Sequence, residues 1–184
     1  MKPLPEILLA LTVVAALSIV YPAKANLITN GGFETGDFTS WAQVGGNIDG
    51  TLPHSGNFAA SFSSTGALQQ SVATTLGASY TINFFLAFIG TPLFHHSFTV
   101  SWGGETLLTL NQDCCDDYTE FAFNVTAPDP STELLFQFDP AFPIGFWLLD
   151  DVSVTSGIPD GGSAVSLLGF ALLGLTALRR KLGC

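Results

Sequence analysis

Short apolar stretches with a period of two residues are the feature that most constrains the fold of this chain. Alternate positions from Tyr80 to Phe88 are all large and apolar, and so are alternate positions from Phe121 to Val125. Because successive side chains of a β-strand point to opposite faces, this pattern puts every second side chain on one buried face. Clusters of Gly, Pro, Asn, Asp and Ser between the stretches indicate turns. The middle of the chain therefore predicts an all-β fold of two packed antiparallel sheets.

The same criteria place the individual strands. Each is short, no longer than about eleven residues, and each is rich in Val, Ile, Thr, Phe or Tyr. We expect strands at Trp41–Ile48, Phe58–Ser63, Ala67–Thr74, Ser79–Ile89, Ser97–Trp102, Thr106–Leu110, Tyr118–Thr126, Glu133–Asp139 and Phe146–Thr155.

The first 25 residues have the layout of a secretory signal peptide. Lys2 is followed by an apolar run from Ile7 to Val20 and then by Ala23-Lys24-Ala25, which fits an A-x-A cleavage site. We expect a signal peptidase to cut there, so that the mature protein begins near Asn26. Between this segment and a distinct C-terminal tail, residues 26–157 form one domain of about 130 residues, enough to bury a core.

This domain contains no basic side chain, since all five Lys and Arg residues lie in the two terminal segments. Of the 15 acidic residues only Glu6 and Asp160 lie outside residues 26–157, which leaves 13 acids and a formal charge of −13 with neutral histidines. A buried carboxylate must therefore be hydrogen-bonded, protonated or neutralised by a bound cation. Nucleic acid is excluded as a partner, because its phosphates need Lys or Arg. Neutral sugars, divalent cations and basic partners remain open.

The tail, residues 158–184, combines three parts in sequence. The turn motif Ile158-Pro159-Asp160-Gly161-Gly162 comes first, then an apolar run from Ala164 to Leu178, and then a basic cluster of Arg179, Arg180 and Lys181. As a helix, the apolar run would rise about 22 Å against a hydrocarbon core of about 30 Å, which predicts a short single transmembrane helix. Basic residues directly after such a run favour the cytoplasmic side, so the domain would lie outside.

This tail resembles the C-terminal sorting signals of the PEP-CTERM type, and most closely the variant whose motif reads VPDSG. Ile158 stands in place of the leading valine and Gly161 in place of the serine. The resemblance implies an exosortase-type transpeptidase that removes the tail beyond the inner membrane, leaving the protein in the cell envelope, at the surface or outside the cell. The alternatives are a permanent membrane anchor and a buried helix, although core helices rarely end in three cations.

Two clusters near the ends of the domain resemble those of a known module. Asn30-Gly31-Gly32-Phe33-Glu34 is followed soon by Trp41, and the last predicted strand reads LLDDVSV from Leu148 to Val154. Between the two clusters, four further residues match the same module: Leu68, Gln70, Tyr80 and Phe84. Together these residues resemble the galactose-binding-like jelly rolls of carbohydrate-binding modules of families 4, 9 and 22. The resemblance implies a jelly-roll sandwich that binds extracellular polysaccharide.

The same resemblance implies a structural Ca²⁺ where the first and last strands meet, with Glu34, Asp150 and Asp151 as the matching carboxylates. Calcium takes oxygen ligands, and a domain without cations of its own needs counter-charge. If the last strand pairs regularly, Asp150 shares an apolar face with Val152 and Val154 and points inward. A bound metal is one solution for such a carboxylate. A hydrogen-bonded acid at a strand end is a second, and acids that only decorate an edge are a third.

Other candidate sites are fewer. Trp41, Trp102 and Tyr118 are candidates for stacking on a sugar ring, although a buried aromatic explains each equally well. Cys114 and Cys115 are adjacent in an acidic loop, where a strained vicinal disulfide, an intermolecular bridge and unreactive thiols all remain open.

No sequence motif for nucleophilic catalysis is present, and the domain has no Lys to form a Schiff base. We therefore expect a non-enzymatic, exported protein associated with exopolysaccharide. A structural or adhesive envelope protein without a sugar site is the first alternative. A small glycoside hydrolase is the second, because 13 carboxylates leave many acid pairs open.

Overall fold

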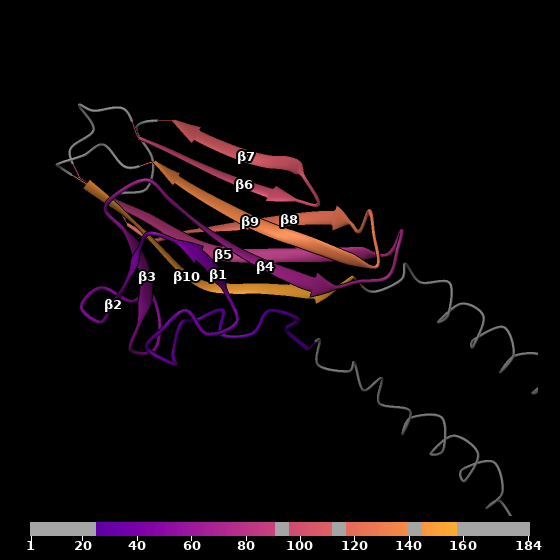
Figure 1. Ribbon diagram of the computed structural model, residues 1–184, viewed down its shortest axis with the longest axis horizontal. Helices are drawn as coiled ribbons and strands as arrows, with labels where there is room; N and C mark the ends of the chain where they lie inside the picture. The colour runs from indigo at the N-terminus through magenta and orange to yellow at the C-terminus, as the bar shows by residue number, and fades with distance from the viewer. Residues whose placement is uncertain (1–24, 91–95, 112–116, 140–144, 158–184) are drawn as a thin grey trace, which may run out of the picture.

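The computed structural model describes residues 25–90, 96–111, 117–139 and 145–157. Within these residues the regular structure is β throughout, in two five-stranded antiparallel sheets (Figure 1). The predicted signal peptide, the predicted C-terminal helix and the Cys114-Cys115 pair lie outside the described residues. In the part of the chain that is described, no helix is long and apolar enough to cross a membrane.

The two sheets pack face to face. The first sheet contains, in spatial order, β1 (Ala42–Val44), β4 (Gly66–Ala73), β9 (Ser131–Asp139), β6 (Ser97–Trp102) and β7 (Glu105–Asn111). The second contains β2 (Asn47–Asp49), β3 (Ala59–Phe62), β10 (Gly145–Ser156), β5 (Ser79–Gly90) and β8 (Thr119–Thr126). Most connections pass from one sheet to the other, as in a jelly roll. The predicted two-sheet antiparallel fold is confirmed.

The core lies between the sheets and follows the predicted alternation. On β5 the alternate residues Tyr80, Ile82, Phe84, Leu86 and Phe88 are all buried. The matching residues of β8, Phe121 to Val125, are half-buried and pack against the same core. Burial of each such side chain contributes about 1.5–3 kcal/mol, so aromatic and aliphatic packing between the sheets is the main source of stability.

The predicted strands coincide with β3 to β10 to within about two residues, but the predicted strand Trp41–Ile48 is wrong. This segment forms two short strands, β1 and β2, which belong to different sheets. Gly45 and Gly46 separate them, with φ values of 66° and 77°. Only glycine adopts such values without strain, so the chain turns here and crosses between the sheets.

The last strand, β10, is interrupted by a bulge. Its register against β5 shifts between Asp150 and Ser153, and Asp151 has a φ of 50°. Leu149 faces the core before the bulge, and Val152 faces it after the bulge. A bulge adds one residue to a strand and so reverses the faces beyond it.

This bulge corrects the prediction for Asp150. Asp150 does not share a face with Val152 and Val154, because it pairs with Phe85 and points to the outer face of the second sheet. Its side chain is nevertheless completely buried, with 0% of its surface exposed. The cover comes from the segment between β2 and β3, residues 51–58, which we call the 51–58 loop.

Candidate functional site

The N-terminal segment lies beside the last strand, as the jelly-roll resemblance implied. The backbone N–H of Leu27 donates to Val154 O at 2.8 Å, and that of Val152 donates to Gly31 O at 2.9 Å. A Cβ at Gly31 would collide with the carbonyl of Val152, so this close approach requires glycine. The arrangement brings Glu34 and the two aspartates of β10 to the same loop.

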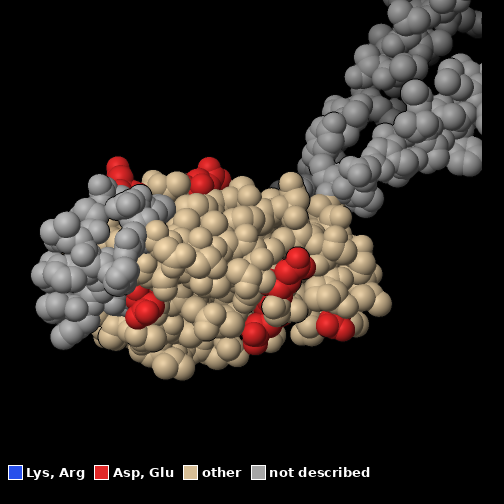
Figure 2. Space-filling view, turned by 90° about the horizontal axis from the view of Figure 1, so that it is seen from above, with Lys and Arg blue, Asp and Glu red and all other residues tan. Residues whose placement is uncertain are grey.

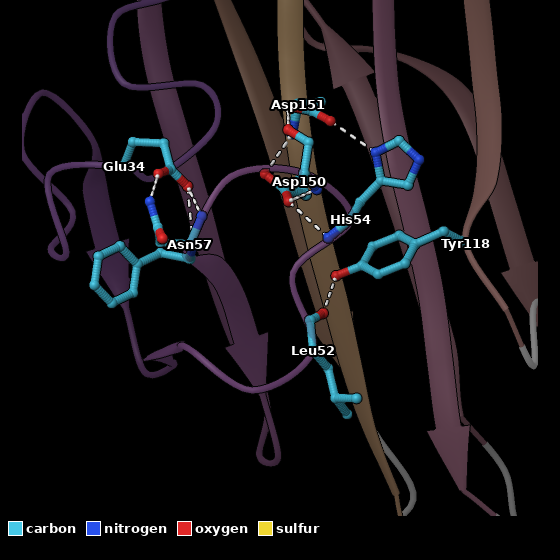
Figure 3. A network of polar contacts seen from close by, with 9 residues as sticks. Glu34, Leu52, His54, Asn57, Tyr118, Asp150 and Asp151 are labelled. Carbon is cyan, nitrogen blue, oxygen red and sulfur yellow. Dashed lines mark hydrogen bonds and ion pairs between the residues drawn. The ribbon is translucent and has the colours of Figure 1, made fainter.

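Glu34 holds the C-terminal end of the 51–58 loop (Figure 3). Its Oε1 accepts the backbone N–H groups of Asn57 at 2.8 Å and Phe58 at 2.9 Å. Its Oε2 accepts the Asn57 side-chain amide at 3.0 Å. The residue is exposed, so its charge stays hydrated. The hydrogen bonds from Asn57 and Phe58 stabilise the charged form and hold the pKa of Glu34 below its usual value.

Asp150 holds the middle of the same loop. Its Oδ2 accepts the backbone N–H groups of His54 at 2.9 Å and Ser55 at 3.2 Å. Its Oδ1 accepts the N–H of Asp151 at 2.7 Å. Burial raises the pKa of Asp150 to about 6; the N–H donors oppose this shift and the charge of Asp151 adds to it.

Asp151 makes the side-chain contacts of the site. Its Oδ2 lies 2.7 Å from His54 Nδ1, and its Oδ1 accepts the hydroxyl of Ser55 at 2.7 Å. The imidazole of His54 also stacks on Phe85, with ring centroids 3.7 Å apart. About a third of the side-chain surface of both His54 and Asp151 is exposed, at 31% and 30%. Solvent therefore weakens this contact compared with the part-buried hydrogen bonds of Asp150.

Tyr118 completes the attachment of the loop. Its hydroxyl donates to the carbonyl of Leu52 at 2.8 Å, and its ring lies 5.1 Å from that of His54. Burial, and then the charges of nearby carboxylates led by Asp150, raise the pKa of Tyr118 above its ordinary value. The phenol therefore stays protonated and continues to donate.

The three acids predicted to bind calcium approach one another beside Gly32, but their carboxylates attach to different residues of the loop. Asp150 and Asp151 hold the loop at His54 and Ser55, whereas Glu34 holds it at Asn57. Among the described residues there is no group of three or more His, Cys, Asp or Glu side chains that could hold a metal ion. Calcium binding stays a prediction, but the oxygens that it would use accept N–H and O–H donors here. Of the alternatives that the sequence left open, a hydrogen-bonded acid describes Asp150. An acid that only decorates an edge does not describe it, because Asp150 is buried.

Two of the three stacking candidates are wrong. Trp41 and Trp102 are only 7% and 3% exposed, so neither ring offers a face to a sugar. Their indole N–H groups donate to the carbonyls of Asn30 and Thr126 inside the domain. The tryptophans are part of the core, as the alternative from sequence held. Tyr118 is half-buried, and stacking by its ring stays a prediction.

The sequence did not single out a second candidate site, on the outer face of the first sheet. Gln137 of β9 lies between Ala67 of β4 and Thr99 of β6, and Thr99 pairs in turn with Thr109 of β7. The hydroxyl oxygens of Thr99 and Thr109 are 3.5 Å apart. These residues form an uncharged polar row across the sheet. The sequence feature that could have revealed this site is the alternation of β9, whose outward positions from Glu133 to Asp139 are mostly polar.

A parallel row adds to this surface. Gln69 of β4 is exposed and lies opposite Leu135, which in turn lies opposite Ser101 of β6. Glu133 and Asp139 stand on the same face at the two ends of β9. On the face of the molecule in Figure 2, acidic side chains are scattered among uncharged residues, and near the middle acidic atoms form one short strip. We call the surface formed by Gln69, Thr99, Thr109 and Gln137 the polar sheet face.

The tail carries a sorting motif. Residues 157–182 match the family model of the VPDSG-CTERM motif, which confirms the resemblance seen in the sequence. The motif implies export and association with the surface or the membrane. None of the curated proteins matches the chain.

The domain has the jelly-roll fold of carbohydrate-binding modules. It is similar to a module of family 61 in complex with β-1,4-galactotriose, with a TM-score of 0.59, 18% identity, and coverage of 72% of this chain and 99% of that one. It is also similar to the family 22 xylan-binding domain of Paenibacillus barcinonensis Xyn10C (TM-score 0.54, 15% identity, coverage 73% and 96%). A third similar structure is the K3 cleaved adhesin domain of Lys-gingipain from Porphyromonas gingivalis (TM-score 0.56, 16% identity, coverage 73% and 100%). At these identities the likeness extends to the fold alone.

Proposed function

We propose that this protein is an exported, non-enzymatic glycan-binding protein of the cell envelope or extracellular matrix, with the polar sheet face as its ligand site. The observation that carries the proposal is the set of uncharged amide and hydroxyl side chains on that face, Gln69, Thr99, Thr109 and Gln137. They stand on a fold that, in similar structures, takes β-1,4-galactotriose or belongs to a xylan-binding domain. The fold alone does not define a ligand, so the proposal depends on this surface.

The two sheets differ in what covers them, and this favours the first sheet. The 51–58 loop lies over the outer face of the second sheet, where Ala87, Leu148 and Asp150 are buried. On the first sheet Gln69, Thr109 and Gln137 are exposed. An extended sugar chain needs an accessible face, and the first sheet offers one.

The chemistry of the polar sheet face favours a neutral glycan. Side-chain amides and hydroxyls both donate and accept hydrogen bonds, as sugar hydroxyls do. With 13 acids and no Lys or Arg in residues 26–157, a uronate or a sulfate would find no cationic partner and would be repelled. The ligand class proposed is therefore a neutral polysaccharide of the extracellular matrix.

A retention experiment tests this function. The full chain in detergent is passed over immobilised neutral polysaccharides, including a galactan and a xylan, with an acidic polysaccharide alongside. We expect retention on at least one neutral glycan, weakened about tenfold or more when Gln137→Ala and Thr99→Ala are combined. The matched control is Thr81→Ala, which removes a hydroxyl from the outer face of the second sheet. Equal retention of the two variants would overturn the polar sheet face as the site.

A second candidate function is adhesion through protein contacts without a sugar site. The similarity to the adhesin domain of Lys-gingipain favours it at the level of the fold. The same experiment separates the two functions, since a protein retained by no glycan but bound to partner surfaces would be an adhesin. If the protein were a hydrolase, it would turn over a model glycoside, and substitution of a carboxylate would abolish that turnover.

We also propose the route of export. A signal peptidase removes residues 1–25, and an exosortase-type transpeptidase cuts at the motif Ile158-Pro159-Asp160-Gly161-Gly162 once the apolar run has entered the inner membrane. Mass spectrometry of the mature protein tests both cuts. A C-terminus intact at Cys184 would instead support a permanent anchor.

A further inference from the structure

The 51–58 loop presents two pairs of adjacent backbone N–H groups, and each pair is bound by a single carboxylate oxygen. The pair of His54 and Ser55 points at Oδ2 of Asp150. The pair of Asn57 and Phe58 points at Oε1 of Glu34. Successive N–H groups that converge in this way form an anion-binding concavity. The loop is thus a double anion receptor whose two anions belong to the protein itself.

Gly56 separates the two pairs and makes this geometry possible. Its φ is 61°, in the region that favours glycine. A Cβ at this position would collide with the carboxyl group of Glu34. The loop can therefore reverse direction and bring its second pair of N–H groups onto Glu34 only with glycine at position 56.

We propose that the N–H groups of the 51–58 loop take the place of a structural cation: their hydrogen bonds stabilise the carboxylates of Glu34 and Asp150, so that the loop stays attached without a metal ion. The domain has no Lys or Arg to pair these acids, which makes the backbone its own source of counter-charge. This inference concerns how the fold is held and does not depend on glycan binding.

The donor geometry explains why calcium fits this arrangement poorly. Calcium needs 6 to 8 oxygen ligands, each offering a lone pair toward the ion. Oδ2 of Asp150 and Oε1 of Glu34 each accept two N–H groups, which occupy the lone pairs of these oxygens. A cation at those oxygens would lie beside the positive ends of the same N–H dipoles.

Gly32 supplies the variant that separates the two arrangements. A Cβ built there would lie 3.5 Å from Oδ1 of Asp151, and 3.8 Å from both Oδ1 of Asp150 and Cγ of Glu34. These are ordinary van der Waals distances, so Gly32→Ala leaves the hydrogen bonds of the loop in place. The added methyl group would, however, fill the space beside the carboxylates that an ion would need.

The first test is thermal unfolding of the full chain in detergent, followed by the fluorescence of the buried tryptophans. We expect the Tm after exhaustive treatment with EDTA to stay within about 1 °C of the Tm in millimolar Ca²⁺ or Mg²⁺. Gly32→Ala should show the same insensitivity. A rise of several degrees with Ca²⁺ that Gly32→Ala removes would overturn the proposal and establish a calcium site.

The second test reads the loop directly, by hydrogen exchange of its amides in EDTA. We expect slow exchange at His54, Ser55, Asn57 and Phe58. Glu34→Gln should speed exchange at Asn57 and Phe58 by at least about tenfold and leave His54 and Ser55 slow. Asp150→Asn should instead speed exchange at His54 and Ser55 and leave Asn57 and Phe58 slow. If that variant does not fold, the result for Glu34→Gln still tests the proposal. Amides that exchange fast in EDTA and slowly only in Ca²⁺ would refute the inference.

Discussion

Glu34 and Asp150 bind the same loop with the same chemistry, yet their surroundings shift their pKa values in opposite directions. Each uses one carboxylate oxygen to accept two adjacent backbone N–H groups. Glu34 is exposed, so the hydrogen bonds prevail and its pKa is lowered. Asp150 is buried, so the cost of desolvating the charge prevails and its pKa is raised to about 6. Identical donors thus stabilise a hydrated carboxylate and only partly compensate a buried one.

The largest effect that the comparison predicts is that of Asp150→Ala. The change removes the buried acceptor of the part-buried N–H groups of His54, Ser55 and Asp151, and we expect a loss of about 2–5 kcal/mol in the free energy of unfolding. Urea denaturation of the full chain in detergent, followed by tryptophan fluorescence, measures it. The matched control is Glu133→Ala on the exposed face of β9, which should change stability by no more than about 0.5 kcal/mol.

The pH dependence sharpens the comparison, because the two acids should act in opposite senses. Burial raises the pKa of Asp150 in the folded protein to about 6, against an ordinary value of 3.8. Its contribution to stability is therefore greatest below about pH 4 and is lost as the pH rises through about 6. Glu34, whose pKa is lowered, contributes above its usual value of 4.5 and loses that contribution as the pH falls through its folded pKa.

Denaturation at several pH values between 3.5 and 7 checks both signs. Subtracting the free energy of unfolding of Asp150→Asn from that of the wild type removes the contributions of all other groups. We expect stability relative to this variant to fall from about pH 4 to about pH 6. The corresponding difference for Glu34→Gln should rise with pH instead. Slopes of the same sign for the two variants would show that burial does not separate the two carboxylates.

Glu34→Ala should cost less than half of what Asp150→Ala costs. Its N–H partners at Asn57 and Phe58 lie near the surface, and water can replace the lost acceptor. The same denaturation experiment compares the two variants. A loss for Glu34→Ala equal to that for Asp150→Ala would break the comparison, because exposure would then make no difference.

Tyr118→Phe is expected to have the smallest effect, a loss of about 1 kcal/mol. It removes one hydrogen bond between neutral groups, from the phenol to the carbonyl of Leu52, while the ring keeps its contacts. Denaturation by urea again gives the value. A loss as large as that of Asp150→Ala would mean that the 51–58 loop depends on its first turn and not on the carboxylates.

Much of the fold could be predicted because it depends on side-chain periodicity. The alternation from Tyr80 to Phe88 appears unchanged as the buried face of β5. The prediction failed where the backbone departs from regular pairing. Gly45 and Gly46 divide one predicted strand between two sheets, and the bulge at Asp151 moves Asp150 to the opposite face. A left-handed φ at a non-glycine residue leaves no mark in a hydrophobic pattern.

The candidate site was predictable in part. Resemblance to a family selected Glu34, Asp150 and Asp151, and all three attach to the 51–58 loop. Their partners could not be predicted, since most are backbone N–H groups. The stacking candidates Trp41 and Trp102 failed for another reason, because composition cannot separate a buried aromatic side chain from an exposed one.

The sequence by itself determined that two β-sheets would enclose an aromatic core, and that any carboxylate buried there would lack a Lys or Arg partner. The tertiary structure alone decided which groups supply the missing counter-charge, and on which face Asp150 lies. The physical reason is that every residue except proline carries a backbone N–H, so these donors have no signature in the sequence. Only the path of the chain brings the N–H groups of residues 54, 55, 57 and 58 onto the carboxylates.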